Sequence, residues 1–154
     1  MKGIHLEQVY PHPIERVWEA IATSSGLAAW LMPNDFEPRV GHRFRFRWKK
    51  IPGWRGIVDC EVTRVEPQRC LAFTWRGEEK HRPTTVTFTL TPVPEGTRLV
   101  LDHDGFEGFG GWISKRMMQG GWRSKMLQRQ LPAALSVLAA HGLEALVPLT
   151  PDPS

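Results

Sequence analysis

The sequence predicts an α+β fold in which a curved antiparallel sheet of about six or seven strands packs around one long C-terminal helix, with two short helices after the first strand. Two observations carry this prediction. Segments of alternating apolar and polar residues, joined by short turns, fill the middle of the chain, and a wide apolar helical face follows from Gly120 to Ala140. A helix that is apolar over so wide an arc must pack against a large surface. We therefore expect it to lie on the sheet, with a pocket between the two.

The N-terminal part predicts one strand and two short helices. The strand runs from Ile4 to Val9 and stops at Pro11-His12-Pro13, because proline cannot donate a hydrogen bond to a neighbouring strand. Capping residues at Thr23-Ser24-Ser25 separate the two helices, and the second ends at Trp30 or Leu31. The apolar residues of the first helix recur at helical spacing: Ile14, Val17, Trp18 and Ile21.

The middle of the chain predicts a series of antiparallel strands. Phe44, Phe46 and Trp48 alternate with arginines at a period of two. Turn residues separate the strands, and strands that meet through short turns must be antiparallel neighbours. A short strand is also expected to begin at Phe36 and to break at Pro38. The other predicted strands cover residues 56–62, 71–76, 85–91 and 98–103.

The C-terminal helix is expected to begin near Trp112 or Ile113 and to end at His141-Gly142. Pro132 lies inside the apolar pattern and predicts a kink, because proline cannot donate to the carbonyl of Gln128. We expect a single domain over residues 1–147 and a loose tail over residues 148–154. The stripe that faces the core is predicted to be Leu127, Leu131, Ala134, Leu135 and Leu138.

Composition narrows the class of protein. Of the 154 residues, 41% are hydrophobic and 23% are charged, which is ordinary for a globular domain. No apolar run is long enough to span a bilayer, and the N-terminus lacks the apolar core of a signal peptide. We therefore expect a cytoplasmic protein without a membrane partner. Motifs for metal, nucleotide and serine-hydrolase sites are absent, so no metal or cofactor is expected.

Cys60 and Cys70 fall on consecutive predicted strands. Folding the hairpin at Pro67-Gln68 places Cys60 opposite about position 75 and Cys70 opposite about position 65. The two thiols are then too far apart for a disulfide, and both are expected to be buried or half-buried.

Several segments, spread over nearly the whole chain, carry a family resemblance. They are Val17-Trp18, Leu27 to Leu31, Gly41, Gly56 with Val58, Leu71 to Trp75, Val86 to Phe88 with Leu90, Gly96 to Leu99, and Gly121-Trp122. In this order they resemble the START/Bet v 1-like (SRPBCC) superfamily, and within it the bacterial homologues of the C-terminal domain of the Hsp90 ATPase activator (AHSA1-like). The resemblance implies a helix-grip fold whose cavity takes lipids, sterols, polyketides or other apolar molecules. Activation of a chaperone ATPase is not expected, because the additional domain and leading motif of the eukaryotic activator have no match in this sequence.

Strand alternation and the resemblance together predict a pocket for a small apolar or amphipathic molecule. The alternative is that the same residues only fill the core, as buried aromatic side chains usually do. The candidate ligand-binding residues on the sheet are Phe46, Trp48, Val58, Phe73, Trp75, Phe88, Leu101 and His103, with Cys60 beside them. Trp30 and Phe36 would close one end, and Met118, Trp122 and Met126 would face the sheet from the helix.

His103 is the best polar candidate in this inward set. It could act as the general base of a cyclase- or hydrolase-type enzyme, or hydrogen-bond a ligand. The neighbouring Asp102 and Asp104 point to the opposite face of the sheet, so they are poorly placed to orient it. The alternative is a half-exposed or core-satisfied histidine without a chemical role.

A basic stripe of Arg43, Arg45 and Arg47 shares the outer face of one strand, with Arg55 and two lysines nearby. It is a candidate surface for an acidic protein partner, as in a co-chaperone-like module. Nucleic acid is not expected, because few aromatic residues share that face. A solvated sheet face explains the charges as well. The edge strand from Ile4 to Val9 is a candidate for pairing in a homodimer.

Overall fold

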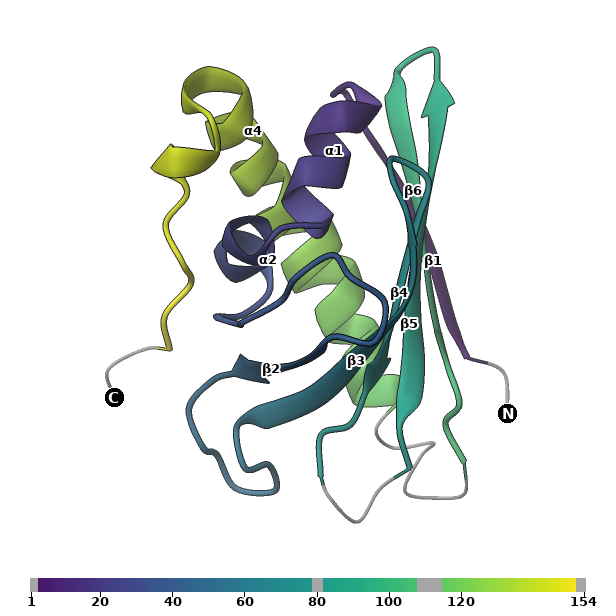
Figure 1. Cartoon of the computed structure of the whole chain (residues 1–154), viewed down its shortest axis with the longest axis vertical. Helices are drawn as coiled ribbons and strands as arrows, with labels where there is room; N and C mark the ends of the chain where they lie inside the picture. Colours follow the sequence, from purple (N-terminus) through teal and green to yellow (C-terminus); the bar gives the residue numbers. More distant parts are fainter. Residues whose placement is uncertain (1–2, 79–81, 108–114, 152–154) are drawn as a thin grey trace.

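A computed structural model describes residues 3–78, 82–107 and 115–151. Within these residues, six strands form one antiparallel sheet in the order β1-β6-β5-β4-β3-β2, and the helices all lie against one face of it (Figure 1). The predicted fold class is confirmed: a sheet of six strands, two short helices after the first strand, and a long C-terminal helix on the sheet. The fold is a helix grip.

The elements follow the predicted order closely. The strands are β1 (Ile4–Tyr10), β2 (Arg43–Arg47), β3 (Ile57–Glu66), β4 (Cys70–Trp75), β5 (Thr84–Val93) and β6 (Gly96–Asp104). The two short helices are α1 (Ile14–Ile21) and α2 (Ser24–Trp30). The long helix is described over residues 115–141, of which Gly121–Gln130 (η1) is π-helical and Leu131–His141 (α4) is α-helical, and a short 3-10 turn, η2 (Leu143–Ala145), follows. Its predicted start at Trp112 or Ile113 lies outside the described residues.

The strand predicted to begin at Phe36 is wrong. The side-chain carbonyl of Asn34 accepts the backbone N–H of Phe36 at 2.9 Å, which bends the chain into a turn instead. Asn34 itself makes only an isolated bridge to Phe46 of β2. Phe36 is nevertheless buried, because its ring packs edge-on against Phe44 with the centroids 5.2 Å apart.

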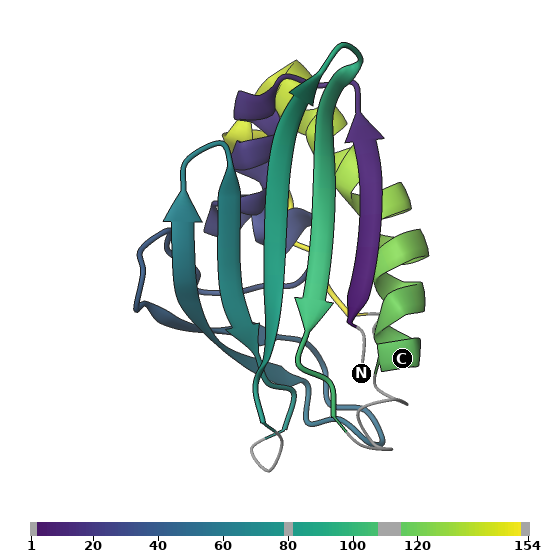
Figure 2. The ribbon, with the colours of Figure 1, turned by 90° about the vertical axis from the view of Figure 1, so that its right-hand side faces the viewer.

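The period-two pattern of the strands is confirmed by burial. In β2, Phe44 and Phe46 are buried and Arg43, Arg45 and Arg47 are exposed. Figure 2 shows the face of the sheet that the helices do not cover. Figure 2 also shows β1 at one edge of the sheet, beside β6, where Ile4 pairs with His103.

The register of the hairpin between β3 and β4 was predicted to within one residue. Asp59 bridges to Arg76 and Val62 pairs with Phe73, so the expected alignment of Cys60 near position 75 holds. Cys70, however, pairs with Glu66 rather than with position 65, because an irregularity between Val62 and Arg64 shifts the register by one residue. Both cysteines are buried free thiols, as predicted.

Pro132 affects the helix one residue away from the predicted place. The backbone of η1 bonds from residue i to i−5, as the N–H of Leu131 to the carbonyl of Met126 illustrates. The next such bond would join residue 132 to the carbonyl of Leu127, and proline has no N–H to donate. The hydroxyl of Tyr10 on β1 donates to that Leu127 carbonyl at 2.7 Å instead. The proline thus leaves an acceptor on the helix that the sheet satisfies.

The predicted apolar stripe of the long helix is buried throughout: Leu127, Leu131, Ala134, Leu135 and Leu138. Its C-terminal half packs against α1 and α2, and the indole N–H of Trp30 donates to the carbonyl of Ala20 at 2.8 Å to join these two short helices. After η2, the backbone N–H of Leu149 donates to the carbonyl of Ala28 at 2.8 Å. In the described part of the chain, no helix has both the length and the apolarity needed to cross a bilayer.

Candidate functional site

A cavity of about 780 Å³ separates the sheet from the N-terminal half of the long helix. It opens at the end of the sheet where the β2–β3 hairpin, the end of β4, the start of β5 and the segment after β6 meet (Figure 1). Its volume falls in the range of pockets that hold small molecules. A second, shallower hollow of about 550 Å³ adjoins it across the β2–β3 hairpin.

Tryptophan and methionine supply a third of the described residues that line the cavity. Four of the seven tryptophans line it, and so do four of the five methionines, the fifth being the first residue of the chain. Indole rings provide large rigid apolar surfaces, whereas methionine side chains adapt their shape. The tryptophans are Trp48, Trp54, Trp75 and Trp122, and the methionines are Met32, Met117, Met118 and Met126.

Six of the thirteen predicted binding residues line this cavity: Trp48, Val58, Trp75, Met118, Trp122 and Met126. The structure does not bring the other seven to its wall. These seven are buried in the packed core behind it: Trp30, Phe36, Phe46, Phe73, Phe88, Leu101 and His103. Most of them contact one another through their rings. Phe88, for example, packs on Trp30 and Phe73 with ring centroids 6.0 Å apart in both pairs.

Sequence reasoning missed several wall residues, among them Trp54 and Phe106. Trp54 follows the turn at Pro52-Gly53, where Gly53 has a φ of 88° that favours glycine. Backbone bonds between Ile51 and Trp54, at 3.1 and 3.0 Å, close this turn and bring the indole back over the opening. A tryptophan directly after a Pro-Gly turn was the available signal. Phe106 follows the end of β6, where no periodic pattern marks it.

His103 lies directly behind the cavity wall in a chain of hydrogen bonds. Its side chain is fully buried, and the rings of Phe106 and Trp75 lie 4.7 and 5.7 Å from it by centroid. The indole N–H of Trp122 donates to Nδ1 at 3.2 Å. Nε2 lies 2.6 Å from the hydroxyl of Thr84, which donates to the carbonyl of Trp75 at 2.9 Å.

These contacts determine the protonation state of His103. An indole N–H can only donate, so Nδ1 must be an unprotonated acceptor, and the neutral ring carries its proton on Nε2, where it donates to Thr84. Burial lowers the pKa of His103 to about 3, so the ring is neutral at physiological pH. The expectation of a half-exposed histidine is therefore wrong. Because both nitrogens are already bonded, neither is free to take a proton from a ligand.

The basic stripe on the outer face is paired with acidic residues of β3. Arg43 lies 3.2 Å from Glu61 and Arg45 lies 2.7 Å from Asp59, each directly across the strand pair. Arg55 contacts Asp59 as well, at 2.5 Å. Burial alone would raise the pKa of Asp59, but hydrogen bonds from Arg55 and Arg45 outweigh it and lower that pKa. The cross-strand pairing neutralises part of the stripe.

Two further expectations concern metals and a flexible loop. Among the described residues, no three histidine, cysteine, aspartate or glutamate side chains are grouped closely enough to hold a metal ion. The sequence also has a glycine-rich run from Gly108 to Gly111, for which we expect a loop that permits movement over the pocket; it lies outside the described residues.

Comparison with known proteins identifies relatives of the same fold. A crystal structure of a Mesorhizobium loti protein is 36% identical, with a TM-score of 0.69 over 88% of this chain and 95% of that one. A solution structure of a Bacillus halodurans protein is 30% identical, with a TM-score of 0.72 over 88% and 97%. The Aha1 dimer from Colwellia psychrerythraea, at 19% identity, shares the fold, with a TM-score of 0.68 over 84% and 94%. No curated protein matches the chain.

The model of one protein family matches most of the chain. Residues 11–136 match the family described as activator of Hsp90 ATPase homolog 1-like protein. This span runs from α1 into α4 and so contains the strands β2 to β6 and most of the residues that line the cavity. The chain belongs to the activator of Hsp90 ATPase homolog 1-like family.

Proposed function

We propose that this protein binds a small amphipathic molecule in the cavity between the sheet and η1. The observation that carries the proposal is the cavity itself, about 780 Å³ in volume, with a wall that includes four tryptophans and four methionines. Moving an apolar molecule from water onto such a wall is favourable, by roughly 25 cal/mol per Å² of apolar surface buried. Polar groups lie near its opening, so the ligand is expected to carry its polar end there.

The proposed activity is binding rather than catalysis. The residue that could have served as a general base, His103, is fully buried and has both ring nitrogens hydrogen-bonded to Trp122 and Thr84. A general base must reach the proton that it abstracts. Instead, His103 links Trp75 to Trp122, two residues of the cavity wall, and so helps to hold their rings in position.

Two adjacent glycines provide a test of the cavity. Gly121 lines the cavity, and a Cβ added there meets no atom within 4 Å, so a larger side chain can enter the empty space. Gly120 is equally open but lies on the exposed side of the helix. Gly121→Phe is expected to weaken binding of the fluorescent apolar probe N-phenyl-1-naphthylamine at least about tenfold, because it occupies the volume that the probe needs.

Gly120→Phe is the matched control, since it adds the same side chain on the neighbouring residue. Its affinity for the probe should equal that of the unmodified protein. Equal affinities for the two variants would contradict the proposal, because the probe would then bind elsewhere. Native mass spectrometry of the purified protein, followed by extraction under denaturing conditions, would identify the chemical class of any ligand that it retains.

The homodimer stays a prediction. β1 is an edge strand of the described sheet, and an edge with unpaired backbone groups can pair with a second copy. The Colwellia psychrerythraea relative is described as a dimer. Sedimentation velocity of this protein, repeated with Gln8→Pro on β1, tests the edge: proline removes a backbone donor and should shift any dimer toward monomer.

A further inference from the structure

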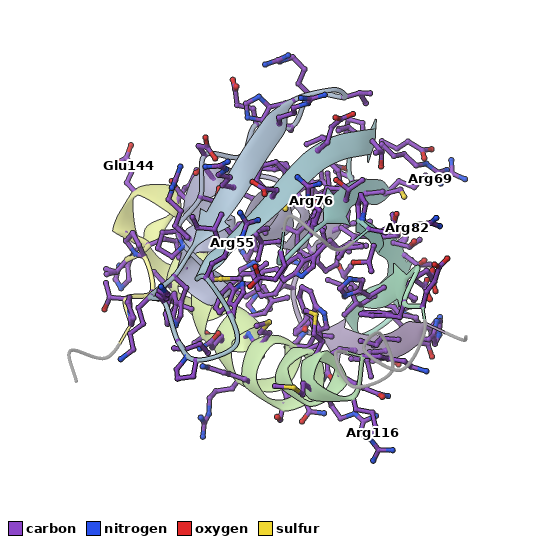
Figure 3. The ribbon with its side chains drawn as sticks, turned by 90° about the horizontal axis from the view of Figure 1, so that it is seen from below. Arg55, Arg69, Arg76, Arg82, Arg116 and Glu144 are labelled. Carbon is purple, nitrogen blue, oxygen red and sulfur yellow. The ribbon has the colours of Figure 1, made fainter. Side chains whose placement is uncertain are left out.

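The opening of the cavity is basic. Among the described residues, the cavity and the adjoining hollow are lined by five cationic side chains, Lys50, Arg55, Arg76, Arg82 and Lys125, and by two anionic ones, Glu78 and Glu107. Figure 3 looks onto this end of the molecule: Arg55, Arg76 and Arg82 come from its sheet side, whereas Arg116 points outward from the helix. The excess of positive charge is therefore gathered where a ligand would enter.

The carboxylates near the opening are already engaged. Glu107 lies 3.6 Å from Arg82, and Glu78 accepts the backbone N–H of Arg55 at 3.2 Å. Asp59, on the outer face behind the opening, is within 4 Å of three arginines at once, with Arg76 the most distant at 3.7 Å. These carboxylates are therefore already bound within the protein.

Two lysines add to the excess. Lys50, in the β2–β3 hairpin, lines the adjoining hollow, and Lys125, on η1, lines the cavity. Within residues 3–78, 82–107 and 115–151, neither lysine forms an ion pair with a carboxylate. Both ammonium groups are therefore available to an anionic ligand group at the opening.

Apart from its charged residues, the lining is mostly apolar. Among the described lining residues, the one hydroxyl, that of Thr84, already donates to the carbonyl of Trp75 and accepts from His103. An ionised group placed there would lose its hydration without a partner. A charged ligand group must therefore stay at the opening, with the apolar part inside.

We infer that the ligand is an amphipathic anion, such as a long-chain carboxylate, whose charged end is held by basic side chains of the lining, among them Lys50 and Lys125, and whose apolar body fills the cavity. This inference rests on the proposed function, because it specifies the ligand of the same cavity. The matching cation would meet the same lysines and arginines and be repelled, whereas an uncharged ligand would gain only from apolar burial.

Three probes with the same dodecyl chain test the sign of the charge: laurate, dodecanol and dodecyltrimethylammonium. Each displaces N-phenyl-1-naphthylamine from the protein at low salt, below the concentration at which micelles form. Laurate is expected to bind about three- to tenfold more tightly than dodecanol, the effect of one or two partly exposed ion pairs, with the ammonium compound weakest. Raising the ionic strength to about 1 M should remove the preference, since screening then acts within ~3 Å.

Reversing the charge of each lysine tests whether it binds the anionic end of the ligand. Lys125→Glu and Lys50→Glu should each abolish the preference for laurate and leave dodecanol affinity unchanged. Arg69→Glu is the matched control: it makes the same change of charge before the start of β4, whereas the lining residues Trp75 and Arg76 lie at the end of that strand, and the preference should persist. Equal affinities for laurate and dodecanol in the unmodified protein, or an unaltered preference in both lysine variants, would overturn the inference while leaving the cavity as a binding site. If none of the three dodecyl compounds displaces N-phenyl-1-naphthylamine, the proposed function fails and the inference fails with it.

Discussion

The interface between the sheet and the long helix has two halves that are built differently. At one end, the helix presents Leu131, Leu135 and Leu138, which are buried where the helix packs against α1 and α2. At the other end, it presents Met118, Trp122 and Met126 across an open cavity, and only Trp122 of these three is fully buried. One sheet and one helix thus make both a packed core and a hollow.

The difference comes from a third layer that is present at one end only. The short helices α1 and α2 lie beside the C-terminal half of the long helix and fill the space there (Figure 1). Beyond them, the opening is bordered by the β2–β3 hairpin and the ends of neighbouring strands. Apolar residues on a concave sheet therefore do not make a cavity by themselves; the cavity exists where the short helices do not reach.

The largest expected effect comes from truncating one side chain in each half. Leu135→Ala should lower the free energy of unfolding by about 2–5 kcal/mol, because it leaves a void in a packed core. Met126→Ala should cost about 1 kcal/mol or less, because its side chain already borders empty space. Urea unfolding followed by tryptophan fluorescence measures both. Similar losses for the two variants would mean that the halves are packed alike.

A second effect depends on pH through His103, which lies between the core and the cavity wall. Its pKa is depressed to about 3 in the folded protein, against about 6.5 when unfolded, so the unfolded chain takes up a proton first as pH falls. Its contribution to stability is complete above pH 6.5 and is lost progressively below it. The slope approaches about 1.4 kcal/mol per pH unit below the unfolded pKa.

His5 on the outer face of the neighbouring strand provides the control. The hydrogen bond that the ring of His5 donates to the carboxylate of Asp102 raises the pKa of His5, so its contribution is present below the unfolded pKa and is lost as pH rises. Between pH 6.5 and 5, His103→Asn should flatten the pH dependence of unfolding measured in urea, whereas His5→Asn should not. A curve of unchanged slope for His103→Asn would show that the buried histidine is not the group that titrates on unfolding.

The smallest effect concerns the hydrogen bond that joins Tyr10 of β1 to the Leu127 carbonyl of the long helix. Tyr10→Phe removes the donor to the Leu127 carbonyl and should lower stability by about 1–2 kcal/mol, since the acceptor is left buried and unsatisfied. In a Pro132→Ala background, the restored N–H of residue 132 can donate to that carbonyl. The cost of Tyr10→Phe should then shrink, and a double-mutant cycle measures this coupling. An equal cost in both backgrounds would separate the tyrosine from the proline.

Much of the fold could be predicted because its signals are local. Alternation at a period of two located the strands and their buried faces, and the leucine stripe located the helix and the side that packs. The errors also had local causes that a pattern does not carry. Asn34 turned the chain away from a strand at Phe36, and one irregularity in β3 shifted the partner of Cys70 by one residue.

The candidate site was only half predictable. Alternation shows which face of the sheet a residue lies on, and so it identified Trp48, Val58 and Trp75 together with Phe46, Phe73 and Phe88. It cannot show how far along the strand the helical layer extends, which is what separates these two groups. The wall residues Trp54 and Phe106 were missed because they follow turns and strand ends, where no periodic signal exists.

By itself, the sequence determined the order of the elements, the direction of their apolar faces and the family to which the chain is similar, because each depends on neighbours a few residues apart. Only the tertiary structure decided where the interface is hollow, that His103 is neutral with both nitrogens bonded, and that the basic side chains gather at one opening. Thr84 and Trp122 each lie 19 residues from His103 along the chain. Contacts over such separations arise from packing, which a local pattern does not encode.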